Sequence, residues 1–365
     1  MIPLEDLSKR LFSRLENWPL GNPIFADPRY TSSRLTLSNF HLLKENSDLS
    51  RICFVDGGNS TLIDSPGLVV SLNRVGFCIY EGEKKLEPIS LRPRVDFFTI
   101  ASASYNRDEI EYYVEFVPLQ ETDREVLPDE ADLVFNSFDR TLMEGRRRAY
   151  LSRVATVSRA FAEWKLASVI IEKELVSGDM LVRDGSLQTQ ITGESKYSNR
   201  AYDLALSKGV LFTGLAKTST LFTDTGMPLF SSIAILANRN GLGEESWYYY
   251  PIVDIRAPDH RAYMFAVKLH SLSKHVFRFE VLSDQAEKME EYGGIISMLA
   301  QNANDLTFPG YPYGLIEADR IARVGEEEVE PLLVQLLSAM SGLDVWDELE
   351  AFVKAVDAHQ VLDEI

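Results

Sequence analysis

The sequence predicts an α/β fold in which a mixed sheet is flanked by helices, and three observations predict it. Runs of apolar, β-branched and aromatic residues of strand length alternate with long segments of helical periodicity. Two of the strand-like runs finish in Asp-Gly, one near residue 56 and one near residue 184. The 365 residues, 45% of them hydrophobic and 25% charged, are typical of a soluble protein that can bury a sizeable core.

The N-terminal residues predict a short amphipathic helix, because Leu4, Leu7, Leu11 and Leu15 recur at helical steps. A connector rich in Pro and Gly, WPLGNPIFADP, follows it, and we assign residues 1–45 to this N-terminal region. The charges in its first turns are atypical of a signal peptide, and no apolar run has the length of a membrane span. We therefore expect a cytoplasmic protein that does not associate with a membrane.

Strand-like runs open the predicted central domain, which we place at residues 46–325. We expect neighbouring antiparallel strands at 51–56, 67–80, 95–102 and 111–119. Cys53 and Cys78 lie inside two of these runs, so we interpret them as small buried hydrophobic residues in a reducing compartment. The sequence has no CxxC zinc motif.

Helical spacing dominates the middle of the chain, from Phe138 to Leu175, and predicts one or two long helices. A strand that ends at Asp184 follows, and further strands are expected in GVLFTGLAKTS (209–219), WYYYPIVDI, AYMFAVKL and HVFRFEVL. Later helices are expected at about 284–302 and from Pro312, which suits a first helical turn. We assign residues 326–365 to an acidic, helical C-terminal extension.

The formal net charge of -18 argues against a protein that coats DNA, because non-specific affinity for nucleic acid comes mainly from basic side chains that release counterions. The charge is unevenly distributed, however. Much of the acid follows Gly325, whereas Arg146, Arg147, Arg148, Arg153 and Arg159 cluster in the middle of the chain. A local basic surface on an acidic protein is compatible with this pattern.

The two Asp-Gly motifs, FVDGG and VRDGS, suggest a metal site formed by Asp56 and Asp184. Two strands that end this way could deliver both carboxylates to one edge of a sheet, and the glycines would allow a metal or phosphate to approach closely. Mg²⁺ and Mn²⁺ prefer oxygen ligands, and a pair of such ions can activate water against a phosphodiester. The alternative is that Asp-Gly simply ends a strand at a turn.

The order of the predicted elements is similar to that of ribonuclease H-like enzymes, which carry carboxylates on the first strand, the first long helix, the next strand and the last helix. The helix candidate is Glu163, which follows Arg159 by one turn. An equally simple interpretation is a surface salt bridge between Arg159 and Glu163 on an exposed helix face, worth tenths of a kcal/mol.

Five short segments resemble the NurA family of nucleases, which act with the hexameric HerA translocase in processing DNA ends. They are FVDGGNS (54–60), the long helix with Glu163, MLVRDGSL (180–187), GLAKTS (214–219) and GYPYGLIEADRIARV (310–324), in the order of the family. The resemblance implies a DNA nuclease that depends on Mn²⁺ or Mg²⁺ and acts in DNA end resection, a homodimer, and a HerA-type ATPase as partner.

The resemblance also implies roles for individual residues. Asp56, Glu163 and Asp184 would be acidic metal ligands, Tyr311 would lie in the catalytic site, and Lys217 could meet a phosphate. Family members commonly carry histidine where this chain has Asp319. Aspartate is an equally good oxygen ligand and would complete a four-carboxylate set, but it cannot act as a neutral imidazole. The exchange bears on metal preference and pH optimum more than on the reaction class.

Helical geometry adds a candidate DNA contact. Arg148 and Arg159 are eleven residues apart and would therefore lie about 20° apart around one helix, on the side of Glu163. We expect both to hold the phosphate backbone beside the metal.

Two other classes of function compete with a nuclease. An actin-like or sugar-kinase-like ATPase also places Asp-Gly turns around phosphates, but the chain has no convincing adenosine motif, and GLAKTS lacks the upstream glycine of a P-loop. A catalytically silent scaffold that clamps DNA or docks on a motor is suggested by Asp319 and by the acidic balance. Retention of the other acidic positions disfavours it.

Overall fold

The computed structural model describes residues 4–16, 18–44, 50–106, 109–285 and 289–341. The chain divides into two compact units. The first comprises Met1–Ser50, Arg183–Gln188 and Phe212–Tyr313, and the second comprises Arg51–Val182, Thr189–Leu211 and Gly314–Ile365. Each unit is therefore assembled from segments that are distant in sequence. The division at residues 45 and 325 that we expected from the sequence stays a prediction.

A sheet organises the second unit. Its strands follow the order β10, β4, β5, β7, β8, β9, and the short β6 pairs with β5. The bounds are β4 Arg51–Asp64, β5 Leu68–Glu81, β6 Lys84–Leu86, β7 Arg94–Asn106, β8 Glu109–Pro118, β9 Phe135–Asn136 and β10 Met180–Asp184. The antiparallel pairing of β4, β5, β7 and β8 confirms the expectation for the four opening strands.

The end of the first of these strands was predicted wrongly. β4 does not stop at Asp56 but continues for eight more residues to Asp64, and Gly57 and Gly58 pair with Val75 and Arg74 of β5. Asp56 is thus a mid-strand residue. We expected glycine after Asp56 to let a metal or phosphate approach closely, with a simple turn as the alternative. Gly57 and Gly58 instead keep extended, paired backbone, and neighbouring elements occupy the space that a Cβ would take.

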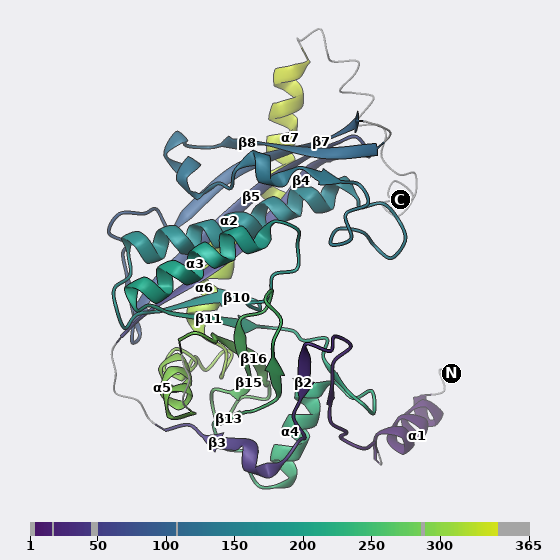
Figure 1. The fold of residues 1–365 in the computed structure, drawn as a ribbon, viewed down its shortest axis with the longest axis vertical. Coiled ribbons are helices and arrows are strands. Elements are labelled where there is room, and N and C mark those ends of the chain that lie inside the picture. Colours follow the sequence, from purple (N-terminus) through teal and green to yellow (C-terminus); the bar gives the residue numbers. More distant parts are fainter. Residues whose placement is uncertain (1–3, 17, 45–49, 107–108, 286–288, 342–365) are drawn as a thin grey trace. The chain divides into compact units, whose positions relative to one another are not determined.

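Helices cover the sheet of the second unit. α2 (Leu151–Lys173) and α3 (Glu194–Lys208) lie side by side in front of β4, β5 and β7 in Figure 1, whereas α7 (Glu326–Met340) passes behind these strands. Most of α2 is buried, since it contacts the sheet on one side and α3 on the other. Residues 138–150, expected to be helical, form turns and a short bridge instead, with Gly145 at φ 64°.

The first unit contains a second set of antiparallel strands, in the order β3, β13, β15, β16, β11. Their bounds are β3 Phe40–Leu42, β13 Trp247–Tyr249, β15 Ala262–Lys268, β16 Phe277–Leu282 and β11 Leu211–Ala216. Two small pairs join β1 (Pro23–Ile24) to β12 (Phe222–Thr223) and β2 (Tyr30–Ser32) to β14 (Val253–Ile255). The expected connector therefore contributes strands, and WYYYPIVDI forms two strands rather than one.

Aromatic side chains fill the core of the first unit. Trp247 and Tyr249 of β13 are almost fully buried, and Phe40 of β3 contacts both rings edge-on. α4 (Leu229–Arg239) and α5 (Met289–Ala300) complete this unit. Leu229 and Ile233 of α4 pack into the same core.

The terminal helices agree with the sequence as far as the structure describes them. α1 (Leu4–Leu15) is the expected amphipathic helix, and α7 is the first part of the expected C-terminal helical extension. Residues 342–365 lie outside the described part of the chain. Among the described helices, none combines the length and the apolar character that a membrane crossing requires.

The two cysteines are buried, as expected. Neither forms a disulfide. Burial raises the pKa of the Cys78 thiol to about 12, and it raises the pKa of Cys53 well above its usual value.

Candidate metal centre

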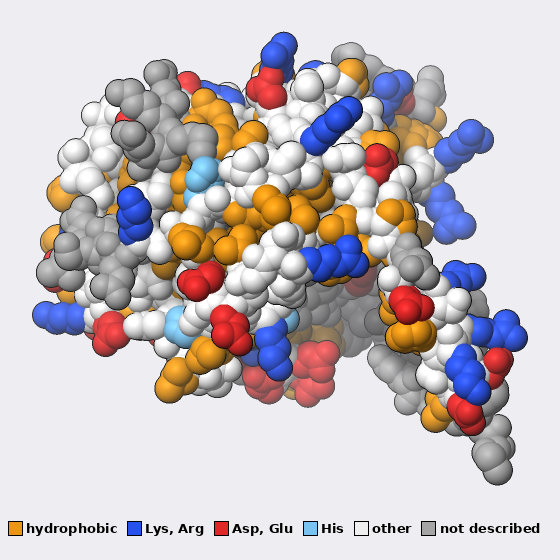
Figure 2. Space-filling model, turned by 90° about the horizontal axis from the view of Figure 1, so that it is seen from below, with side chains coloured by type: hydrophobic (Ala, Val, Ile, Leu, Met, Phe, Trp, Pro, Cys, Tyr) orange, Lys and Arg blue, Asp and Glu red, His pale blue; other side chains and the backbone are white. Residues whose placement is uncertain are grey.

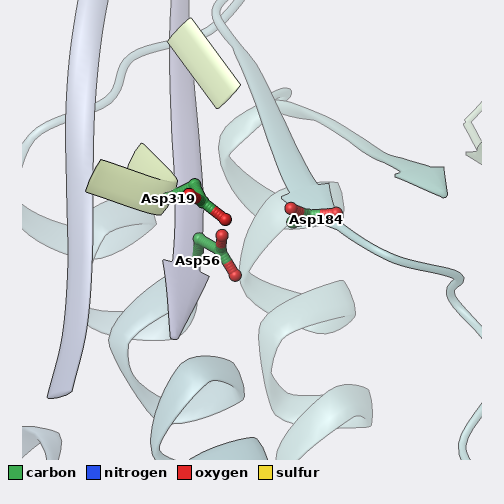
Figure 3. A group of neighbouring side chains, drawn as sticks. All are labelled: Asp56, Asp184 and Asp319. Atoms are coloured by element: carbon green, nitrogen blue, oxygen red, sulfur yellow. The ribbon is translucent and has the colours of Figure 1, made fainter. Parts of the chain in front are cut away.

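Three carboxylates lie close together, two from the Asp-Gly motifs and one from the late helix. Asp56, Asp184 and Asp319 each present an oxygen, and the three oxygens lie within 4.8 Å of one another. Figure 3 shows the three side chains on the three elements that carry them, β4, the end of β10 and α6 (Tyr313–Ala322). The Asp-Gly motifs predicted Asp56 and Asp184, the family resemblance pointed to Asp319, and the structure brings all three together.

The surroundings of Asp56 include Glu163, although Glu163 is not a member of this group of three. A Cβ added to Gly57 would lie 2.4 Å from Glu163 Oε1, so the carboxylate packs directly on the backbone that follows Asp56. Arg159 forms an ion pair with Glu163 and donates a hydrogen bond of 2.9 Å from Nη1 to the Gly57 carbonyl oxygen. Gly57 N–H itself donates to Asp56 Oδ1 at 2.7 Å.

This arrangement overturns the interpretation of Arg159 and Glu163 as a surface salt bridge. Only 3% of the Glu163 side chain is exposed. A buried carboxylate needs partners to offset its loss of hydration. Arg159 supplies that partner, and the pair contacts Gly57, the residue that follows the candidate metal ligand Asp56.

Asp184 is the last residue of β10, as predicted. Gly185 follows at φ 112°, a conformation that favours glycine, and its N–H donates to the Leu215 carbonyl of β11 at 2.9 Å. The Asp184 side chain is 12% exposed and forms an ion pair of 2.7 Å with Lys217 Nζ. Lys217 was expected to meet a phosphate, and the structure places its ammonium on Asp184.

Tyr311 is buried beside this lysine. Lys217 Nζ lies 5.9 Å from the centre of its ring, which also packs against Phe277 and Phe308. Its proximity to the partner of Asp184 agrees with a place in the site, whereas a catalytic role for Tyr311 stays a prediction.

Asp319 reaches the group from α6, which packs very closely on β4 and β5. A Cβ on Gly58 would lie 2.3 Å from the Ala322 carbonyl oxygen, and one on Gly76 would lie 2.5 Å from Ile321 Cγ2. Only glycine allows a helix backbone this close to a strand. The Asp319 carboxylate, with 34% of the side chain exposed, accepts a hydrogen bond of 2.7 Å from Arg323 one turn later.

A buried arginine on β5 fixes the end of α6. Arg74 is 2% exposed, donates to the Arg323 carbonyl, and forms ion pairs with Asp96 at 2.5 Å and Glu328 at 2.6 Å. Burial alone would lower the pKa of Arg74, but hydrogen bonds to Glu328 and Asp96 raise it. Arg74 was not among the residues predicted from the sequence. Its charge inside the apolar run GLVVSLNRVGFCIY was the available signal.

Arg148 is the clearest departure from the expected site. It precedes α2, which begins at Leu151, so the geometry of a shared helix face does not apply to it. Its guanidinium instead lies 5.5 Å from the centre of the Phe138 ring. A DNA contact by Arg148 or Arg159 stays a prediction.

The three carboxylates fit a hard divalent cation. Mg²⁺ binds oxygens at about 2.1 Å, so opposite ligands of an octahedron are roughly 4.2 Å apart. Of three ligands at least two pairs are adjacent, roughly 3.0 Å apart, so oxygens that lie within 4.8 Å of one another must approach by up to about 1.8 Å to share one ion. Lys217 and Arg323, which now pair with Asp184 and Asp319, are the cations that a metal would displace or rearrange.

Comparison with known proteins places this geometry in context. A family model described as the NurA domain matches residues 50–324. A crystal structure of the NurA nuclease from Sulfolobus solfataricus is 12% identical, with a TM-score of 0.50 over 93% of this chain and 94% of that one. A second NurA crystal structure is 9% identical, with a TM-score of 0.52 over 95% and 99%. A third, described as NurA with manganese, is 9% identical with a TM-score of 0.46 over 94% and 98%. No curated protein matches.

Proposed function

Because the chain belongs to the NurA domain family, we propose that it is a divalent-metal-dependent nuclease that hydrolyses phosphodiester bonds in DNA. The observation that carries the proposal is the convergence of Asp56, Asp184 and Asp319 within 4.8 Å. Three carboxylate oxygens suit Mn²⁺ or Mg²⁺, and the fold similarity to a solved NurA nuclease supports the same reaction class.

In this proposal the residues of the candidate centre have different roles in hydrolysis. Asp56, Asp184 and Asp319 would hold the metal, which would supply charge stabilisation for the phosphate and lower the pKa of a bound water. Glu163, held by Arg159, adds negative charge beside Asp56 and completes the expected set of four carboxylates. Lys217 forms an ion pair with Asp184, and its ammonium would be available to a phosphate oxygen if a metal took its place at that carboxylate.

This chain has Asp319 where the family resemblance leads us to expect histidine. An aspartate adds a negative charge and cannot act as a neutral base, so we expect stronger preference for hard cations and no loss of activity from protonation near neutral pH. The roles in DNA end resection, the HerA-type hexameric ATPase as partner and the homodimer are part of the proposal. They are supported by membership of the family alone.

A nuclease assay with Mn²⁺, run beside an ATPase assay on the same preparation, tests the proposal. We expect metal-dependent cleavage of DNA, abolished by chelation, and no ATP hydrolysis. ATP hydrolysis without cleavage would favour the actin-like alternative. Tight DNA binding with neither activity would favour the silent scaffold, for which the occupation of Asp184 by Lys217 and of Asp319 by Arg323 is the supporting observation.

A further inference from the structure

A groove runs beside the first turns of α2 and leads towards Glu163. Its volume is about 460 Å³, within the range of sites that bind small molecules or single residues of a polymer. Tyr150, Ser152, Arg153, Thr156 and Arg159 line it, with Glu144 at its margin. All of these residues belong to the second unit.

The spacing of the lining residues gives the groove a direction. Ser152, Thr156, Arg159 and Glu163 are separated by four, three and four residues, so they share one face of α2. Eleven residues of helix span about 16 Å. The groove therefore extends along the helix from its N-terminal turn to Arg159, which forms an ion pair with the buried Glu163.

Two side chains at the far end of this groove have the chemistry that recognises a nucleotide. Tyr150 is 52% exposed, although it is aromatic, and the Arg153 side chain is 43% exposed. Within the described part of the chain the Arg153 guanidinium has two distant partners, Glu144 at 3.7 Å and the Thr141 carbonyl at 3.5 Å. An exposed ring can stack on a base, and a weakly held guanidinium can bind a phosphate.

Because the protein as a whole is acidic, binding of a nucleic acid requires a local surface that carries positive charge. On the face drawn in Figure 2, Lys and Arg side chains are scattered among acidic and apolar ones, and the described residues form no continuous basic surface there. Arg153 and Arg159 bring two cations to one groove that leads to the carboxylates.

We propose that this groove binds the single-stranded segment of nucleic acid that flanks the cleaved phosphodiester, with a base on Tyr150 and a phosphate on Arg153. The inference rests on the proposed nuclease function. A single strand is favoured over a duplex because the bases of a duplex are stacked on one another and cannot offer a face to Tyr150.

The experiment measures the affinity of the full chain for a single-stranded oligonucleotide by fluorescence anisotropy without divalent metal, so that no cleavage occurs. Stacking of one base is worth about 1–3 kcal/mol, so Tyr150→Ala should weaken binding by about 5- to 150-fold. Tyr150→Phe keeps the ring and should bind like wild type. Arg153→Ala should reduce the salt slope by about 0.7. Glu144→Gln, which removes an acid from the margin, should tighten binding.

Arg124→Ala is the matched control, because Arg124 is an exposed arginine outside the groove and pairs only at the surface with Glu121. Equal affinities of Tyr150→Ala and the control would overturn the inference, and so would an equal loss for a duplex of the same length. Metal-dependent cleavage by wild type is measured in parallel. If the wild type cleaves DNA but Tyr150→Ala binds normally, only the inference about the groove is contradicted. If Tyr150 contributes to binding but no cleavage occurs, the proposed nuclease function is contradicted.

Discussion

The Glu280 carboxylate accepts a hydrogen bond of 2.6 Å from the backbone N–H of Leu187, three residues after Asp184. Glu280 is fully buried on β16 and also accepts from His260 Nε2 at 3.0 Å and from Arg278. Tyr30 OH contacts the other ring nitrogen of His260. A buried hydrogen-bonded network in the first unit therefore holds the backbone at Leu187, just after the candidate metal ligand Asp184.

We predict that Glu280→Gln lowers the free energy of unfolding by about 3 kcal/mol, because Arg278 is left as a nearly buried charge without its counterion. Burial alone would raise the pKa of Glu280, but Arg278, His260 and the Leu187 amide lower it to about 2. A lowered pKa means that the stabilisation is complete above the unfolded value of about 4.5 and is lost as the pH falls towards 2.

Urea unfolding from pH 7 to pH 3 measures this effect. Wild type should lose stability over the acidic part of that range, and Glu280→Gln should lose less. Glu115→Gln, the same change at an exposed position on β8, is the control and should behave like wild type. Equal stability of Glu280→Gln and Glu115→Gln at pH 7 would show that the charge of Glu280 contributes nothing to the free energy of unfolding.

Removing one charge from the carboxylate group should abolish cleavage. Asp56→Asn and Asp184→Asn keep the size of the side chain but weaken a metal ligand, so we expect activity with Mn²⁺ to fall by at least about a hundredfold, with little change in melting temperature. Asp203→Asn on the exposed face of α3 is the control. If both variants cleave DNA at the wild-type rate, the proposed centre is wrong.

Divalent metal should raise the melting temperature of the wild type by several degrees, because a ligand at a hundred times its Kd stabilises a protein by about 2.7 kcal/mol. Asp319→Asn should reduce this rise. Without metal, the substitution removes the repulsion between Asp319 and the carboxylates of Asp56 and Asp184, which should increase stability. The increase should be slight, because the substitution also weakens the surface pair with Arg323, and such pairs are worth about 0–1 kcal/mol. Calorimetry with and without Mn²⁺ measures both effects.

Two further variants separate a ligand from a solvated helix charge at this position. Asp319→His should retain part of the activity if the position binds metal, because imidazole is also a ligand. Asp319→Ala should lose both Mn²⁺ binding and cleavage. Wild-type behaviour of Asp319→Ala would leave Asp319 as an ordinary surface residue.

The close packing of α6 on β4 predicts a stability difference between two glycines. Gly58→Ala places a Cβ 2.3 Å from the backbone oxygen of Ala322, which cannot move without shifting α6, so we expect a loss of about 2–3 kcal/mol. Gly294→Ala in α5 meets nothing within 4 Å and should be neutral or stabilising, since alanine favours a helix. Thermal unfolding of the pair tests this, and equal melting temperatures would contradict the role of Gly58.

Gly58→Ala should also impair metal binding, because a displaced α6 carries Asp319 with it. Mn²⁺ titration of the folded variant measures this consequence separately from its stability. A variant that melts earlier but binds Mn²⁺ normally would mean that α6 tolerates the shift without moving the carboxylate.

The sequence by itself determined most of the strands, the terminal amphipathic helix and the candidate ligands Asp56 and Asp184. Periodicity and composition report on local structure, and Asp184 is the last residue of its strand as its Asp-Gly motif indicated. Asp319 was identified through a family resemblance rather than from its spacing, and its role as a ligand stays a prediction.

Only the tertiary structure decided what the glycines and the charged residues do. Gly57 and Gly58 look like a turn in the sequence, yet they continue β4 because Glu163 and α6 need the space that a Cβ would take. The pairing of Glu280 with Leu187 joins residues 93 positions apart. Local sequence patterns do not encode such distances, since burial and charge pairing depend on which remote segments the folded chain brings into contact.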